Sequence, residues 1–310
     1  MPRTAALPPL AFACLLFNAF VWGVTWWPFR QLNMLGVHSL WATGMAFLFS
    51  TVVLSVGRPR AWLALLQRPA LWWLALASGL TNAAFNWGVM VGEVVRVVLL
   101  FYLMPVWSLL LARLLLRETV SRGALLRIGL ALAGALVVLW QPEAGLPLPG
   151  SLADWLGLGG GAAFAGVNVL VRRYRDSADD TRALAMFFGG FVVAVGTAWV
   201  MSAAGRIAYL PSATPLWVGG VAALALVLLA ANLALQYGAA RLPAAVTSIV
   251  MMSEVAFAAA SSAWLSNEQL DARTMIGGAL ILSATLSAAL SRSAPAAATP
   301  PGGAARDHGS

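Results

Sequence analysis

The chain of 310 residues is 61% hydrophobic and only 10% charged, with a mean hydropathy of +0.83. Soluble domains carry about 25% charged residues, so this chain lacks the polar surface of a water-soluble protein and most of its exterior must face lipid. One cysteine, Cys14, and two histidines, His38 and His308, exclude an internal disulfide and argue against a zinc site. The net charge of +8 comes from arginines spread between apolar runs, which indicates membrane topology rather than a nucleic-acid-binding patch.

Apolar runs long enough to cross a bilayer occur ten times along the chain. A hydrocarbon core of about 30 Å needs roughly 20 helical residues to cross it. The first run is too long for a cleaved signal peptide and is followed by "PFR". The sequence therefore predicts an all-α integral membrane protein with ten transmembrane helices. They are expected near 10–29, 36–56, 70–91, 94–113, 122–140, 152–171, 182–204, 213–237, 243–265 and 271–291.

The distribution of arginine predicts the side of the membrane on which each connecting segment lies. With the N-terminus inside, 15 of the 19 arginines fall in inner segments, and Arg30, Arg96, Arg206 and Arg273 lie on the outer side. Cytoplasmic loops are enriched in Lys and Arg, so both termini are predicted to be cytoplasmic. The lysine-free, alanine-rich composition suggests a GC-rich bacterial genome, and the expected location is the bacterial inner membrane.

Two segments that lie 150 residues apart are alike. "TNAAFNWG" at 81–88 aligns with "ANLALQYG" at 231–238, which sets Asn82 opposite Asn232. "FVWGVT" matches "FAGVN" more weakly, with their glycines aligned, and "LMPVW" falls against "MSEVA" after a one-residue shift. These matches indicate that the chain consists of two copies of one unit.

The two repeats are predicted at 1–140 and 152–291, joined by an outer linker at 141–151 and followed by a disordered tail at 292–310. Each repeat holds five helices, an odd number, so the second copy is upside down in the membrane. Inverted repeats of this kind build secondary transporters, whose substrate site lies near the midplane where the repeats meet. The alternative is a duplicated structural bundle with no transport role.

These features resemble the EamA-type branch of the drug/metabolite transporter superfamily. The residues that carry the resemblance are "VWG" at 21–23, "YLMPVWSLLLARLLLRE" at 102–118 and "NVLVRRY" at 168–174. The resemblance implies a basket of ten helices around a central cavity, with no ATP site, no metal and no other cofactor. "VGRPR" at 56–60 and "YLMP" at 102–105 look most like the members that export aromatic amino acids.

The fourth run contains a proline, Pro105, near its middle. Proline removes one backbone hydrogen bond and leaves a carbonyl one turn earlier, near Phe101, without its partner. One interpretation is a hinge beside the cavity, with Tyr102, Met104 and Trp107 near the substrate, and the resemblance favours it. The other is a kink that a neighbouring helix satisfies. Tyr102 would offer a ring and a hydroxyl to an aromatic solute.

Asparagines at repeat-equivalent positions are further candidates. Asn82 and Asn232 either line the cavity and hold the amino or carboxylate group of a solute, or clamp adjacent helices by hydrogen bonds. Asn86 and Gln236 lie nearer the helix ends, so clamping is expected for them. Asn168 matches the end of the family's sixth helix and is expected to face the inner vestibule.

Two residues near helix ends have competing interpretations. Trp22 belongs to the family's first-helix motif and either stacks on a substrate ring or anchors the helix at the membrane interface. Arg96 is the basic residue placed inside the outer end of a helix. It either attracts a substrate carboxylate, or extends to the headgroups or pairs with Glu93.

Glu254 lies at the centre of the ninth run, near the predicted midplane. A charge there costs at least about 2.5–3.5 kcal/mol on insertion scales, which favours a functional role. It could bind the ammonium group of a substrate, or it could titrate and couple proton entry to efflux. The structural alternative is a protonated carboxyl that hydrogen-bonds to Ser253 or to a carbonyl and holds two helices together.

The resulting hypothesis is a secondary transporter that exports amino acids, aromatic ones first, by alternating access between the repeats. Its expected partners are the solute and the lipid bilayer, with a monomer as the default state. The alternatives are a proton-coupled exporter of drugs or other small metabolites, and a passive channel. A membrane enzyme is disfavoured, because the predicted spans hold no constellation of His, Cys, Asp and Glu and no Ser–His pair.

Overall fold

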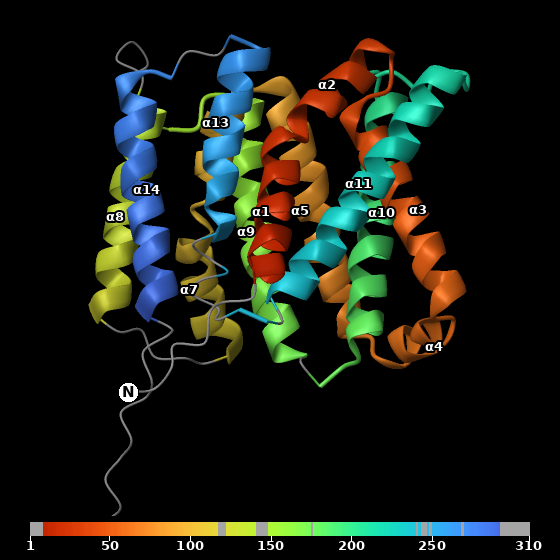
Figure 1. Ribbon diagram of the computed structural model, residues 1–310, viewed down its shortest axis with the longest axis horizontal. Helices are drawn as coiled ribbons and strands as arrows, with labels where there is room; N and C mark the ends of the chain where they lie inside the picture. The colour runs from red at the N-terminus through yellow and green to blue at the C-terminus, as the bar shows by residue number, and fades with distance from the viewer. Residues whose placement is uncertain are drawn as a thin grey trace, which may run out of the picture.

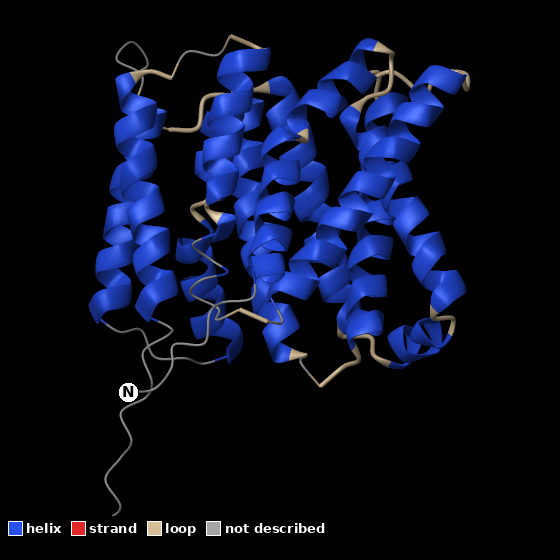
Figure 2. Ribbon diagram, viewed as in Figure 1, coloured by secondary structure: helices blue, strands red, loops and turns tan. Residues whose placement is uncertain are grey.

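The computed structural model of the protein describes residues 9–116, 122–140, 148–174, 176–239, 241–242, 247, 250–267 and 270–291. Within these ranges the chain folds into helices and connecting loops, with no strand among them (Figure 2). The predicted tail at 292–310 and most of the predicted linker at 141–151 lie outside the described residues. The helices are α1 (Pro9–Val24), α2 (Trp26–Met34), α3 (Ser39–Gly57), α4 (Arg60–Gln67), α5 (Leu71–Val91), α6 (Val94–Phe101), α7 (Met104–Leu116), α8 (Arg122–Leu139), α9 (Leu152–Arg173), α10 (Asp179–Ala203), α11 (Pro215–Ala239), α13 (Ser253–Leu265) and α14 (Ala272–Ser291).

Seven helical segments in the described part of the chain are long and apolar enough to cross a membrane. The chain is therefore a multi-pass membrane protein. Of the other predicted spans, 70–91 is the 21-residue helix α5, 271–291 is α14, and 243–265 is described in part, chiefly as α13. The seven segments are Pro9–Met34, Ser39–Gly57, Val94–Leu111, Arg122–Leu139, Leu152–Arg173, Asp179–Ala203 and Pro215–Leu235.

The long helices stand side by side, with their ends at two opposite levels (Figure 1). α1 runs to the upper level of this view, where α2 continues the chain, and α4 lies at the lower level. α9 begins at the upper level and ends at the lower one with Arg172 and Arg173. The arginine-rich segments 58–68 and 172–173 thus share the lower level, which is the side that the sequence predicts to be cytoplasmic.

Helices from the two halves of the chain interleave. α5 of the first half packs against α9 and α10, and α11 of the second half packs against α1 and α3. α8 packs with α14, α10 with α3, α1 with α13, and α9 with both α6 and α7. The most extensive interfaces all join a helix of one half to a helix of the other. The described halves are therefore built as one body rather than as two separate bundles.

Glycines bring the backbones of α5 and α10 into direct contact. A Cβ on Gly189 would overlap with the carbonyl oxygen of Ala75, and a Cβ on Gly79 would overlap with the carbonyl oxygen of Gly189. Lipid supplies no hydrophobic force that drives helices together, so membrane helices associate through such close packing of small residues. This interface holds first-half and second-half helices at a fixed distance.

Gly189→Val should therefore destabilise the protein, because the new side chain would have to displace backbone atoms of α5. Overpacking of this kind costs about 1–3 kcal/mol or more. Gly196→Val on the same helix is the matched control, since no atom lies within 4 Å of a Cβ at that position. The measurement is the midpoint of thermal unfolding in detergent micelles. Equal midpoints for the two variants would contradict the close packing of α5 on α10.

Candidate functional site

The fourth predicted span is two helices, α6 and α7, separated by a turn at Tyr102 and Leu103. The backbone N–H of Tyr102 donates to the carbonyl of Val98 at 3.0 Å, and that of Leu103 donates to Leu100 at 3.2 Å. Pro105 is the second residue of α7, where a missing N–H costs little because the first N–H groups of a helix have no intrahelical partner. The prediction of a proline in mid-helix is thus corrected: Pro105 begins a helix.

The carbonyl near Phe101 is covered by α9. A Cβ on Gly161 would overlap with the carbonyl oxygen of Phe101, so the glycine lets the backbone of α9 lie directly on this group. Contacts between Cα–H groups and carbonyls partly compensate a carbonyl that lacks its usual donor. A helix from the second half thus packs directly on the break in the first half.

The ninth predicted span has its own break at the equivalent position. Met252 forms a turn between the helical residue Met251 and the start of α13 at Ser253. Met252 lies 150 residues after Tyr102, within one residue of the offset at which the sequence aligns "LMPVW" with "MSEVA". Glu254 stands in the first turn of α13, where the partial positive charge of a helix N-terminus favours a carboxylate.

The two breaks touch one another through Tyr102. Its hydroxyl lies 3.3 Å from the carbonyl oxygen of Met251 and 3.3 Å from Oε2 of Glu254. Tyr102 is only 4% exposed, so these contacts are shielded from solvent. The sequence predicts each residue as a candidate separately, and the structure brings Tyr102 and Glu254 together.

A chain of aromatic rings runs beside the first break. Trp22 of α1 packs edge-on against Phe85 of α5 at 6.1 Å, and Phe85 packs against Phe101 of α6 at 5.0 Å between ring centroids. Phe101 also contacts Phe164 of α9 at 5.4 Å and Tyr102 at 6.4 Å. Rings from four helices therefore gather at the break. Sequence analysis named Trp22 and Tyr102 and missed the three phenylalanines, although Phe164 opens the "FAGVN" repeat match.

Two predicted residues of α7 follow the break. Met104 is half-buried and packs against the same apolar cluster as Tyr102. Trp107 is also half-buried, and its indole Nε1 is buried without a hydrogen-bond partner among the described residues. A buried donor without a partner costs free energy, so this N–H is available to an acceptor that enters from outside the protein.

The predicted asparagines have different surroundings. Asn82 is half-buried and donates to the carbonyl of Ser78 in its own helix at 2.9 Å, while Asn232 is half-buried on α11. Asn168 is exposed. Asn86 is fully buried and donates to the hydroxyl of Thr43 on α3 at 3.0 Å. Asn86 thus clamps two helices, as its position near a helix end predicts, and the side chain of Gln236 lies outside the described part.

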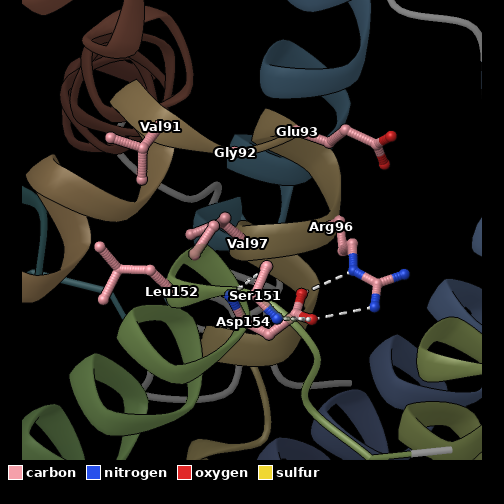
Figure 3. A pocket seen from close by; sticks show the side chains of 9 residues that line it. Val91, Gly92, Glu93, Arg96, Val97, Ser151, Leu152 and Asp154 are labelled. Carbon is pink, nitrogen blue, oxygen red and sulfur yellow. Dashed lines mark hydrogen bonds and ion pairs between the residues drawn. The ribbon is translucent and has the colours of Figure 1, made fainter.

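Arg96 forms an ion pair at the upper end of α6 (Figure 3). Its Nε donates to Oδ1 of Asp154 at 2.6 Å, its Nη2 donates to Oδ2 at 3.1 Å, and its Nη1 donates to the carbonyl of Val138 at 2.8 Å. The expected partner, Glu93, extends to the same side as Arg96 in Figure 3, but no dashed line joins the two side chains. The pairing with Glu93 is therefore corrected to Asp154, and the contact with a substrate carboxylate would have to displace that residue.

Asp154 is fixed by the start of α9. Its Oδ2 accepts from the backbone N–H groups of Gly150 at 3.1 Å and Ser151 at 3.3 Å, and its own N–H donates to Oγ of Ser151 at 3.1 Å. This reciprocal arrangement is a capping box. Sequence analysis missed Asp154, although the pattern Ser-x-x-Asp at 151–154 signals such a helix start.

A recess of about 520 Å³ lies beside this ion pair. It is lined by the turn between α5 and α6 and by the first turn of α9 (Figure 3). Leu152 on its rim is 53% exposed, whereas Ala153 and Asp154 below it are buried. The recess thus lies at the upper end of the bundle, above the contact between α6 and α9.

The arrangement described so far is a helical membrane bundle with two discontinuous helices that meet. Its first half has relatives. Residues 9–140 match the model of the EamA-like transporter family. The EamA-like segment spans α1 to α8, and it contains the first break, Trp22, Asn82 and Arg96.

Solved structures resemble the whole bundle. Thirteen chains match, and one of them, described only as "Crystal structure of protein", has a TM-score of 0.52 at 17% sequence identity. The likeness covers 90% of this chain and 96% of that chain, so the shared fold extends beyond the EamA-like segment into the second half. No curated protein matches the chain.

Asp154→Ala should destabilise the protein by about 3–5 kcal/mol, the range for breaking a buried ion pair. The side chains of Arg96 and Asp154 are 16% and 2% exposed, so the change would strand a guanidinium beneath the surface. The double variant Arg96→Met/Asp154→Leu leaves no charge behind and should therefore lose less stability than Asp154→Ala. Thermal unfolding of both variants in detergent is the measurement. A smaller loss of stability in Asp154→Ala than in the double variant would contradict the pairing.

Proposed function

We propose that the protein is a secondary transporter of small solutes, with the substrate site where the breaks of the fourth and ninth spans meet. The observation that carries the proposal is the contact of Tyr102 with Met251 and Glu254. Discontinuous helices that meet near the midplane provide free helix ends and backbone groups for a solute. The match of residues 9–140 to EamA-like transporters supports the same class.

An inverted repeat of five spans underlies the proposed mechanism. Suppose that each span is exchanged for its counterpart five places away in the other half. The contact between α5 and α9 then corresponds to the contact between α11 and α1, and that between α5 and α10 corresponds to that between α11 and α3. The pair α1–α13 becomes α9 with α6 and α7, while α8–α14 and α3–α10 map onto themselves. All of these pairs are in contact, which supports ten spans in two equivalent halves. Equivalent halves can exchange conformations, which gives alternating access to one central site.

Aromatic amino acids are the solutes that this site suits best. The rings of Trp22, Phe85 and Phe101 provide edge and face contacts for an aromatic side chain. Glu254 and Tyr102 offer acceptors to an ammonium group, and the unpartnered indole N–H of Trp107 offers a donor to a carboxylate. Export as the direction of net transport rests on the resemblance of the "YLMP" segment to aromatic-amino-acid exporters.

Counterflow in proteoliposomes tests the proposed function. Vesicles loaded with unlabelled phenylalanine or tryptophan should transiently accumulate trace labelled phenylalanine, because a carrier exchanges solute across one site. Protein-free vesicles are the control, and saturation of the flux separates a carrier from a passive channel. Vesicles with folded protein that accumulate no more label than the control would refute the aromatic-amino-acid assignment.

Glu254→Gln should lower this exchange about tenfold or more, because a hydrogen bond to a charged group contributes about 1.5–3 kcal/mol. Tyr102→Phe, which removes only the hydroxyl, should lower it less. Asp176→Asn is the matched control: it also changes a carboxylate to an amide, but at an exposed pair with Arg68 far along the chain from the breaks. The measurement is the initial rate of exchange with and without a pH gradient. Exchange that needs the gradient, and loses that dependence in Glu254→Gln, would instead indicate a proton-coupled exporter.

A further inference from the structure

The strongest contact between charged groups of the two halves lies at the predicted outer face. Arg96 is on α6 of the first half and Asp154 is on α9 of the second, and both oxygens of the carboxylate engage the guanidinium. The third nitrogen donates to Val138 at the end of α8. A two-pronged pair of this kind fixes the relative position of its partners more closely than a single contact does. It therefore ties three helix ends together.

The backbones of α6 and α9 also lie close together just below this end. A Cβ on Gly157 would lie 2.9 Å from the carbonyl oxygen of Val97, and a Cβ on Gly92 would overlap with the side chain of Ala153. Val97 has no exposed surface, although it lines the wall of the recess. The seam between α6 and α9 is thus closed below the recess.

The two parts of the fourth span differ in burial. Every residue of α6 except Arg96 is buried, from Val94 to Phe101. On α7, Trp107, Ser108 and Leu109 are half-buried, and Leu110 and Leu114 are exposed. The outer part of this span is therefore fully packed against its neighbours, whereas the inner part is not.

The repeat-related positions on the inner side hold no charged pair. At the offset of 150 residues, the position of Arg96 corresponds to Val246 and that of Asp154 corresponds to Thr4. Neither residue carries a charge. The described pair that joins the halves at the opposite level, Arg68 with Asp176, is 48% and 69% exposed, and such surface pairs contribute little. Among the described residues, the ion pairs that join the halves at the two levels thus differ in burial.

We propose that the Arg96–Asp154 pair is a latch that holds the outer side closed and must separate before the site opens outward. The inference rests on the proposed alternating access. Its consequence is a resting state biased toward a closed outer face, because the repeat-related positions on the inner side hold no charged pair. Neutralising the latch should raise the population of the outward-open form.

Access of a reagent to Val97 tests the latch. Cys14, the one natural cysteine, is first replaced by alanine, and Val97→Cys then introduces a slightly smaller side chain into the closed seam. The full-length protein in right-side-out vesicles is treated with a membrane-impermeant maleimide. Modification should be slow with the pair intact. Arg96→Gln/Asp154→Asn, which leaves no unpaired charge, should speed it about tenfold or more, equivalent to about 1.4 kcal/mol.

Asp176→Asn in the same background is the control, because it breaks an ion pair between the halves at the other level. It should leave the modification rate unchanged. An unchanged rate in the double variant, from protein that elutes as a single folded species, would overturn the latch. Equal acceleration by Asp176→Asn would also overturn the latch, because the loss of an ion pair at the other level would then speed the modification just as well.

The outcome is separable from that of the proposed function. The maleimide reaction needs no solute, so the latch can stand even if counterflow fails to show exchange of aromatic amino acids. Counterflow by the unmodified protein, together with an unchanged reaction at Val97→Cys, would leave the transporter in place and remove the latch.

Discussion

Hydrocarbon offers no hydrogen-bond partner to a protein backbone, and the rest of this structure depends on that constraint. A helix that breaks inside the membrane must cover its free carbonyls with other parts of the protein. Here the break after Phe101 lies against Gly161 of the second half, and Tyr102 reaches back to the break at Met251. The breaks can therefore exist only at the interface of the halves, which is also the place where a shared substrate site would form.

The interleaved packing makes the two halves mechanically dependent. Since α5 lies against α9 and α10, while α11 lies against α1 and α3, neither half can shift without the other. Under the proposed alternating access, a rearrangement that separates helices on one side would bring their counterparts together on the opposite side. Arg96 and Asp154 interrupt this symmetry, because the repeat-related positions hold uncharged residues. Under the same proposal, this pair of side chains distinguishes the outer face from the inner one.

Sequence analysis anticipated features that depend on local chemistry. Composition and the length of the apolar runs predicted a helical membrane protein, and seven of the ten predicted spans correspond to helical segments long and apolar enough to cross a membrane. Pro105 predicted an interruption of the fourth span, and the structure corrected its form from a kink to a helix start. Of the alternatives for Arg96, the pairing with Glu93 was wrong: Glu93 is near in sequence, whereas the observed partner, Asp154, is 58 residues away. Pairing over such a separation leaves no trace in a single sequence.

The sequence by itself determined that this chain lies in a membrane and where most of its helices run, and it predicted that the halves are related. Hydropathy, arginine placement and repeated motifs carry that information locally. Only the tertiary structure decided that Tyr102 contacts Glu254, that three phenylalanines pack together at the break, and that Asp154 forms an ion pair with Arg96. The physical reason is that contacts between helices depend on rotation, depth and close approach, which many side chains fix jointly.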